Sequence, residues 1–334
     1  MKTKMVETRK TIVGVGSALV DILAHEDDAF LTEAGAVKGG MIYVEKSHIE
    51  QTLARISGRL SIVPGGSACN TVVGVSQLGG KARFVGKRGS GKMGDFFENA
   101  LRANNVDPRL FRSEVSTGRV LSIITPDAER SMFTFLGAAA ETRPEDIRED
   151  LFADAAIVHI EGYLLFNPQL ILTALKAAKS AGARVSLDLA SFNVVEESRD
   201  LLSGVVQNYV DILIANEDEA RAYTGESDPL PAIRALGREV NVAALKLGPR
   251  GSIICRDGQF IAVPAEGDGR AVDTTGAGDL WASGFLFGLT EGYPLEKCGA
   301  IGSACGYEVC QVVGASIPEE GWRRIRNLLE KDEK

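Results

Sequence analysis

AIVHIEGYLLFNPQLILTALKAAKSAGARVSLDL, residues 156–189, decides the fold class because two strand-like runs flank a helix-like run. The runs at 156–162 and 184–189 are short, apolar and bounded by turn residues, as buried strands are. Between them, Pro168 opens a helical pattern and Gly182 closes it, which are the residues that helices favour at those ends. A strand, a helix and a second strand in succession predict parallel strands joined by a covering helix.

The same alternation extends along the chain in both directions. Further strand-like runs are TIVGVG from Thr11, ARFVGK from Ala82, VDILIAN from Val210 and VAALKLG from Val242. We therefore predict an α/β protein with a mainly parallel central sheet covered on both faces, forming a single domain over residues 1–334.

Two stretches interrupt this rhythm, from about residue 21 to 64 and from 117 to 139. The second contains the alternating runs RVLSIIT (119–125) and SMFTFLG (131–137), joined by the turn PDAER (126–130). Together the two stretches predict a small β-sheet lid inserted into the α/β core. Such a lid could cover a ligand at the carboxyl ends of the parallel strands.

Composition excludes several classes of function. The chain has 37 Lys and Arg against 45 Asp and Glu, a net charge of −8, so nucleic acid is not an expected partner. No apolar run approaches the ~18 residues that span a bilayer, and the amino terminus lacks a secretory signal pattern. Five cysteines without a CxxC pair predict neither disulfides nor a zinc site, so we expect a cytoplasmic protein.

The segment GKRGSGKMGD (86–95) contains two phosphate-binding patterns that we interpret as coincidental. Gly89, Gly91 and Gly94 match G-x-G-x-x-G, and residues 86–92 match G-x-x-x-x-G-K. However, Met93 stands where a P-loop needs a hydroxyl for Mg²⁺, and the segment does not follow the first strand as in a dinucleotide fold. The preferred interpretation is a turn before an amphipathic helix.

The segment AVDTTGAGDLWASGFLFGL (271–289) is the stronger candidate site. Gly276, Ala277 and Gly278 lie directly before a helical run, so their amide groups and the helix dipole could bind an anion. Asp279 falls in the first helical turn, where its carboxylate could either complement the dipole or accept a proton from a hydroxyl group.

At this point the chain resembles the ribokinase-like (pfkB) family of carbohydrate and nucleoside kinases. DTTGAGD (273–279) is similar to the DTxGAGD signature, and PGGSACNTVVGVSQLGG (64–80) resembles the first signature of that family. Further matches lie at TGR (117–119), NEDE (216–219), KLGPRG (246–251) and VVGAS (312–316), so the resemblance covers nearly the whole chain. It implies a ribokinase-like three-layer sandwich and an ATP- and Mg²⁺-dependent kinase.

The resemblance also implies roles for individual residues. Asp279 would be the catalytic base, with the amides of Gly276, Ala277 and Gly278 as the anion hole. The residues implied for substrate binding are Asp21, Ser17, Gly65, Gly66, Asn70 and Phe135. Those implied for the nucleotide are Asn216, Glu219, Lys246, Gly248, Gly251, Gly306 and Val309, with Glu219 holding Mg²⁺ through water. Those at the positions of a monovalent cation (K⁺) in some members are Asp273, Thr275, Val312 and Gly314.

The acceptor is the least determined part of this prediction. The opening GSALVDILA, the GGSACN motif and the lid run are most similar to adenosine-kinase-like members, so adenosine is the first choice. Phe133 or Phe135 could stack on its base or could belong to the lid core. Ser17 departs from the Asn that nucleoside-specific relatives often carry there. The alternative functions kept open are a free-sugar kinase, a Rossmann-type oxidoreductase and a non-catalytic nucleoside-binding protein. Separately, a homodimer formed through the lid is an open expectation.

Overall fold

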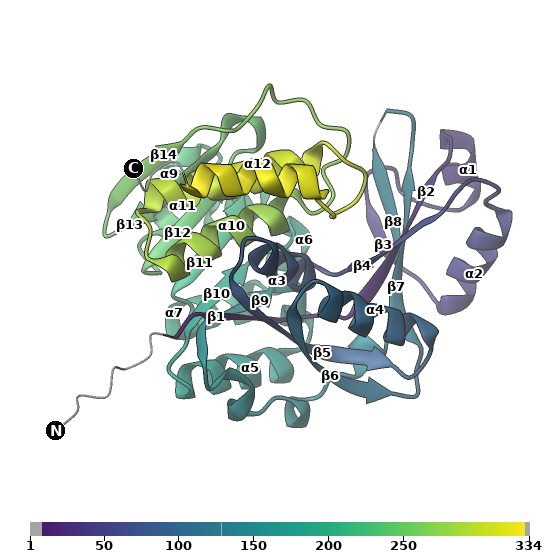
Figure 1. Cartoon of the computed structure of the whole chain (residues 1–334), viewed down its shortest axis with the longest axis horizontal. Helices are drawn as coiled ribbons and strands as arrows, with labels where there is room; N and C mark the ends of the chain where they lie inside the picture. Colours follow the sequence, from purple (N-terminus) through teal and green to yellow (C-terminus); the bar gives the residue numbers. More distant parts are fainter. Residues whose placement is uncertain (1–8, 128, 331–334) are drawn as a thin grey trace.

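A large mixed sheet forms the centre of the protein (Figure 1). The computed structural model describes residues 9–127 and 129–330, so residues 1–8 of the amino terminus and residue 128 of the predicted PDAER turn lie outside the described residues. In spatial order the strands are β14 (Gln259–Val263), β13 (Ser252–Arg256), β12 (Val242–Lys246), β11 (Ile212–Asn216), β10 (Arg184–Asp188), β9 (Ala155–Glu161), β1 (Thr11–Val15), β5 (Lys81–Gly89) and β6 (Val106–Ser113). Neighbours from β12 to β6 pair in parallel, whereas β13 and β14 are antiparallel additions at one edge.

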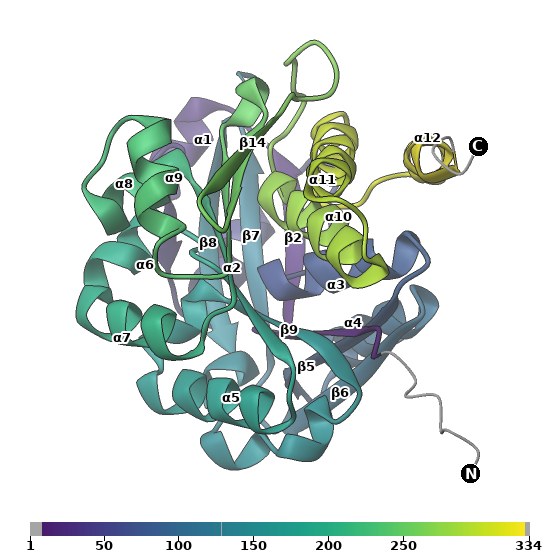
Figure 2. The same cartoon turned by 90° about the vertical axis from the view of Figure 1, so that its left-hand side faces the viewer.

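Helices cover both faces of this sheet because successive strand residues point to opposite sides (Figure 2). In β9, for example, Val158 packs into one hydrophobic cluster and Ile157 into the other. The helices of the first face are α5 (Pro168–Ser180), α6 (Phe192–Glu197), α7 (Arg199–Tyr209), α8 (Glu217–Thr224) and α9 (Pro229–Leu236). Those of the second are α3 (Ser67–Gln77), α4 (Lys92–Ala103), α10 (Ala277–Glu291) and α11 (Leu295–Cys310), with α12 (Glu319–Glu330) packed on α11.

A smaller sheet stands against the carboxyl ends of the parallel strands. Its order is β3 (Met41–Tyr43), β8 (Arg130–Gly137), β7 (Thr117–Ile124), β2 (Leu19–His25) and β4 (Ser61–Gly65). One face packs on α1 (Asp28–Glu33) and α2 (Lys46–Arg55) through a core that includes Ile22, Leu121 and Phe133. The other face is turned toward the large sheet.

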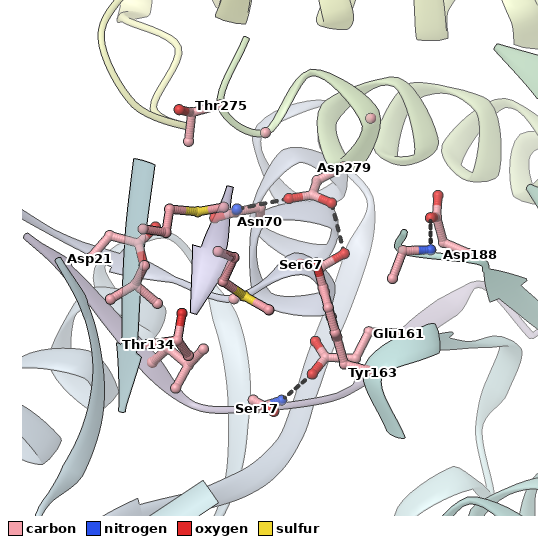
Figure 3. A pocket seen from close by; sticks show the side chains of 18 of the residues that line it. Ser17, Asp21, Ser67, Asn70, Thr134, Glu161, Tyr163, Asp188, Thr275 and Asp279 are labelled. Carbon is pink, nitrogen blue, oxygen red and sulfur yellow. Dashed lines mark hydrogen bonds between the residues drawn. The ribbon is translucent and has the colours of Figure 1, made fainter. Parts of the chain in front are cut away.

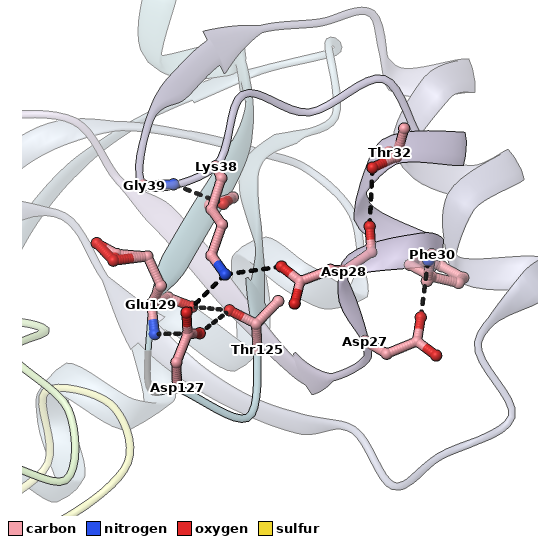
Figure 4. A network of polar contacts seen from close by, with 10 residues as sticks. Asp27, Asp28, Phe30, Thr32, Lys38, Gly39, Thr125, Asp127 and Glu129 are labelled. Carbon is pink, nitrogen blue, oxygen red and sulfur yellow. Dashed lines mark hydrogen bonds and ion pairs between the residues drawn. The ribbon is translucent and has the colours of Figure 1, made fainter.

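Ion pairs fasten the tip of the β7–β8 hairpin to the segment before β3 (Figure 4). The Lys38 ammonium lies 2.6 Å from Asp127 and 2.7 Å from Asp28, and the Gly39 amide donates to Ser131 Oγ at 2.9 Å. Exposed ion pairs contribute little to stability, about 0–1 kcal/mol each. Their effect here is to restrain the hairpin end from which Arg130 projects.

The fold class agrees with the prediction, because a large mainly parallel sheet is accompanied by a smaller β-sheet. Each quoted strand-like run forms a strand, and α5 begins at Pro168 and ends before Gly182, which has a positive φ of 75°. The GSGKMG segment runs from the last residue of β5 through a short turn into the first residues of α4, as the preferred interpretation expects, and a Cβ at Gly94 would overlap the carbonyl oxygen of Gly89. Among the described residues, no helix is both long and apolar enough to cross a membrane.

Candidate active site

A cavity of about 350 Å³ lies between the two sheets, and we name it the inter-sheet cavity (Figure 3). The ends of β9 to β12, the starts of α3 and α10, and one face of the small sheet line it. This is the location where parallel α/β sheets bind ligands, because the strand ends and the helix N-termini meet there.

The start of α10 is built to leave backbone amides free. Gly276 has a φ of +73°, a left-handed conformation that only glycine adopts readily, and this bends the chain into the helix. The Ala277 amide donates to Thr274 O at 3.1 Å, but within the described residues the amides of Gly276 and Gly278 have no hydrogen-bond partner. Two of the three predicted anion-hole amides are therefore available to a ligand, and the third is engaged within the chain.

The carboxylate of Asp279 faces the cavity and is held by side chains of α3. Ser67 Oγ donates to Asp279 Oδ1 at 2.7 Å, and Asn70 Nδ2 donates to Oδ2 at 2.9 Å. Burial raises the pKa of Asp279 above its ordinary value, although the hydrogen bonds from Asn70 and Ser67 oppose the shift. The arrangement fixes the carboxylate in one orientation while making it a better base than an exposed aspartate.

Asp21 reaches the same cavity from β2. Its carboxyl group lies directly over Gly65, where any Cβ would overlap it, so the glycine is required by this close approach. Burial raises the pKa of Asp21 to about 7; Arg130 opposes this shift and Asp279 adds to it. Gly66, the N-cap of α3, also lines the cavity.

Glu161, at the end of β9, is a cavity residue that the sequence analysis did not identify. It is buried, and its two oxygens accept hydrogen bonds from the Ser17 amide (2.8 Å) and the Ala68 amide (3.2 Å). Burial raises the pKa of Glu161 to about 7 despite these bonds. Ser17 also lines the cavity, with its backbone amide bound to Glu161, and its contact with a substrate stays a prediction.

The structure corrects the prediction that Phe135 contacts the substrate. In β8 the residues that line the cavity are Arg130, Met132, Thr134 and Leu136, whereas Phe133 and Phe135 pack with the core under α1 and α2. Alternation along a strand places the two sets on opposite faces. Both phenylalanines therefore belong to the core of the small sheet, which was the alternative to stacking on a base.

A second cavity, of about 380 Å³, lies beside α10 and α11, and we name it the helix-side cavity. Five residues predicted to bind nucleotide line it: Asn216, Lys246, Gly248, Gly251 and Gly306. Val309 does not, because its side chain is fully buried in the cluster between α11 and α12. The prediction that Val309 flanks the nucleotide is therefore wrong, and Tyr307 and Cys310 occupy the cavity wall instead.

Asn216 and Glu219 form the capping box of α8. The Glu219 amide donates to Asn216 Oδ1 (2.9 Å), and the two Glu219 oxygens accept from the Asn216 amide and Nδ2, both at 2.8 Å. Burial raises the pKa of Glu219 to about 7, while Lys246 opposes the shift. Each Glu219 oxygen thus already accepts one hydrogen bond and keeps a further lone pair for a ligand.

Lys246 projects from the end of β12 and pairs with Asp188 at the end of β10, with 2.8 Å between Nζ and Oδ2. Burial alone would raise the pKa of Asp188, but the Lys246 ammonium prevails and lowers it. Burial opposes the charge on Lys246, yet the facing carboxylates of Asp188 and Glu219 hold its pKa above the usual value. Each group therefore stabilises the charged form of the other.

Three of the residues at the predicted cation positions meet in one place. Asp273 Oδ1 accepts from the Thr275 amide (2.9 Å) and hydroxyl (2.6 Å), and Asp273 Oδ2 accepts from the Gly314 amide (2.8 Å). Arg130 of the small sheet donates to Thr275 Oγ1 at 2.8 Å. Val312 lies in the turn after α11, where its amide donates to Val309 O.

The polar cavity residues that sequence reasoning missed include Arg130, Ser67, Glu161 and Asp188. A signal was present for the last two, because each is an acid at the carboxyl end of a predicted parallel strand. No local pattern marks Ser67 or Arg130, since their partners lie 212 and 145 residues away in the chain.

Comparisons with known proteins find carbohydrate and nucleoside kinases. The family model described as pfkB family carbohydrate kinase matches residues 35–321. The crystal structure of adenosine kinase from Sinorhizobium meliloti has 34% identity and a TM-score of 0.88, covering 96% of this chain and 99% of that one. A probable sugar kinase from Rhizobium etli CFN 42 has 33% identity and a TM-score of 0.89 with the same coverage. Probable fructokinase-7 of Arabidopsis thaliana is 28% identical over 317 residues, covering 89% of this chain and 84% of the relative.

Proposed function

The chain belongs to the pfkB family of carbohydrate kinases and is thus a phosphotransferase acting on a hydroxyl group, and we propose that it transfers the γ-phosphoryl group of ATP to a primary hydroxyl of a nucleoside, adenosine first. The observation that carries this proposal is the start of α10, where two amides without a partner in the described part of the chain lie beside the Asp279 carboxylate, between two cavities.

The two cavities would hold the two substrates. The helix-side cavity, with its glycine-rich walls and Tyr307, suits the nucleotide, and the inter-sheet cavity, with Asp21 and Asp279, suits a polyhydroxylated acceptor. In this arrangement the acceptor hydroxyl gives its proton to Asp279 while its oxygen attacks the γ-phosphorus. The amides of Gly276 and Gly278 bind the charge that develops on the phosphoryl oxygens.

Magnesium would be held near Asn216 and Glu219, with Glu219 binding it through water as the resemblance to the pfkB family implies. Bound there, Mg²⁺ would neutralise charge on the phosphates. A monovalent-cation site at Asp273, Thr275, Val312 and Gly314 stays a prediction. A homodimer formed through the small sheet also stays a prediction.

The choice of a nucleoside rests on similarity and on space. The relative from Sinorhizobium meliloti is an adenosine kinase. In addition, a third cavity of about 550 Å³ adjoins the inter-sheet cavity and shares Ser17, Tyr43, Leu136 and Tyr163 with it. The lining of this third cavity is mostly apolar, and its volume can hold a group larger than a sugar ring, such as a nucleobase.

A free sugar is the second candidate acceptor, and Glu161 is the observation that favours it. With Asp21 and Asp279 it gives the inter-sheet cavity a third carboxyl group able to accept hydrogen bonds from sugar hydroxyls. The probable sugar kinase from Rhizobium etli is about as similar to this chain as the adenosine kinase is.

The test is a coupled assay of ADP release with a panel of nucleosides and sugars, with and without Mg²⁺. We expect adenosine to be fastest and the rate to require Mg²⁺; a free sugar as the fastest acceptor would replace the proposed substrate. Asp279→Asn should lower kcat by about 10²–10⁴-fold while MgATP still binds. Near-normal turnover by that variant would refute the role of Asp279.

A further inference from the structure

Five residues line both the inter-sheet cavity and the helix-side cavity and so form the passage between them. They are Asn216, Lys246, Thr274, Ala277 and Gly278. If the acceptor and the nucleotide occupy the two cavities as proposed above, the transferred phosphoryl group must pass this set. Of the five, only Lys246 carries a charge.

The Lys246 ammonium lies against the first turn of α10. A Cβ placed on Gly278 would be only 2.9 Å from Lys246 Nζ, so the ammonium is next to an amide that has no partner among the described residues. A cation beside a free amide at a helix N-terminus attracts the same ligand, an anionic oxygen. Lysine binds phosphate as a compact point charge with three donors, so it can contact a ligand while paired with a carboxylate.

Asp188 is placed to hold this lysine and not the substrate. It is 4% exposed, with Oδ2 bonded to Lys246 and Oδ1 accepting from the Ala190 amide at 2.9 Å. Ala190 has a φ of +64°, a conformation unusual for a residue with a side chain. The backbone after β10 is thus strained at Ala190, the residue whose amide donates to Asp188.

We infer that Lys246 is a catalytic residue that binds an oxygen of the transferred phosphoryl group, and that Asp188 is its positioning residue; the inference rests on the proposed phosphoryl transfer. The acceptor oxygen forms a bond to the γ-phosphorus, and the bond from that phosphorus to the β,γ-bridging oxygen breaks. The electron pair leaves with ADP, and the hydroxyl proton moves to Asp279. Lys246 stays protonated throughout and only stabilises charge.

Substitution of Lys246 tests the catalytic contact. Lys246→Met should lower kcat by about 10²–10³-fold, the loss typical of removing one donor to a developing charge. It should also weaken MgATP binding by about tenfold more than MgADP binding, because only ATP carries the phosphoryl group at the passage. Equal weakening of MgATP and MgADP binding, measured by calorimetry without acceptor, would overturn the inference.

Substitution of Asp188 tests the positioning role through pH. The titratable groups that face Lys246 are Asp188 on β10, Glu219 on α8, Asp279 on α10 and His159 on β9. Asp188→Asn removes the nearest negative charge, so Lys246 should lose its proton at lower pH and the alkaline limb of kcat should move to lower pH. An unmoved alkaline limb would refute the role, since a merely structural residue would change the rate without moving this limb.

The double variant Asp188→Asn/Lys246→Met guards against misfolding from an unpaired buried ammonium, because it removes both charges. If the pair acts as a unit, its kcat should be no lower than that of Lys246→Met. Independent, multiplying losses would contradict the inference.

The matched control is Asp211→Asn, because Asp211 pairs with Lys179 at the same 2.8 Å but at the opposite end of the sheet. It should leave kcat and the alkaline limb as in the wild type; a shift like that of Asp188→Asn would overturn the assignment. The kcat of each variant is compared with that of the wild type using the fastest acceptor of the panel, and the nucleotide-binding measurements are made without any acceptor. Failure of adenosine as acceptor is therefore distinguishable from failure of this inference.

Discussion

Replacement of Ser67 by alanine should change the pH at which the proposed base becomes active. Ser67 Oγ donates to Asp279 Oδ1 at 2.7 Å and stabilises the ionised carboxylate, while burial favours the neutral acid. Removing this bond leaves burial less opposed, so the pKa of Asp279 should rise further.

The size of the shift follows from the type of bond. A hydrogen bond to a charged group contributes about 1.5–3 kcal/mol, and one pKa unit corresponds to about 1.4 kcal/mol. Ser67→Ala should therefore move the acid limb of kcat/KM upward by about 1–2 pH units, since the base must be ionised to accept a proton. The limb of kcat/KM reports the free enzyme, so changes in acceptor binding do not displace it.

Thr71→Val is the matched control for this measurement. Thr71 Oγ1 also bonds to Asp279, but to its backbone carbonyl, at 3.1 Å. The control should lose about 0.5–1.5 kcal/mol of stability without moving the acid limb. An acid limb that Ser67→Ala leaves in place, or that both variants shift equally, would refute the role assigned to the Ser67 hydroxyl.

Two further predictions concern stability. Burial raises the pKa of Asp21, Glu161 and Glu219 to about 7, above the value of about 4 in an unfolded chain, so the folded state binds the additional protons. The free energy of unfolding should thus fall as pH rises from 6 to 8, by on the order of 1 kcal/mol per group, and urea denaturation that showed a rise would contradict this. Gly74→Ala should destabilise the protein by about 1–3 kcal/mol, because the added Cβ would lie 2.6 Å from a side-chain carbon of α10. Gly204→Ala in α7, where nothing lies within 4 Å, should instead stabilise it by about 0.4–1 kcal/mol; equal thermal shifts of the two variants would refute the packing argument.

The elements of the fold follow from local patterns. The runs that became β9, β10, β11 and β12 are short, apolar and bounded by turn residues, and such runs form buried strands whatever lies far away in the chain. Pro168 and Gly182 act within one helical turn of the ends of α5. The loop before α10 likewise depends on the backbone freedom of Gly276, which is a property of the residue itself.

The direction in which side chains point was not predictable in the same way. Phe135 occurs in a correctly predicted strand, and Val309 lies in α11, yet the side chain of each packs away from the cavity that it was expected to line. Along a strand, adjacent residues point to opposite faces, so a prediction that is off by one position reverses the outcome. Which face meets a cavity is decided by how the sheets and helices pack.

The amino-acid sequence by itself determined the α/β class, the small second sheet, and the loop that offers amides beside Asp279, because the strands, helices and turns that build them are formed from local patterns of residues. Only the tertiary structure decided the partners of the site: Ser67 with Asp279, Asp188 with Lys246, and Glu161 with the Ser17 amide. These pairs join residues 58 to 212 positions apart. Folding brings them together at the strand ends because parallel strands place their carboxyl ends at one edge of the sheet.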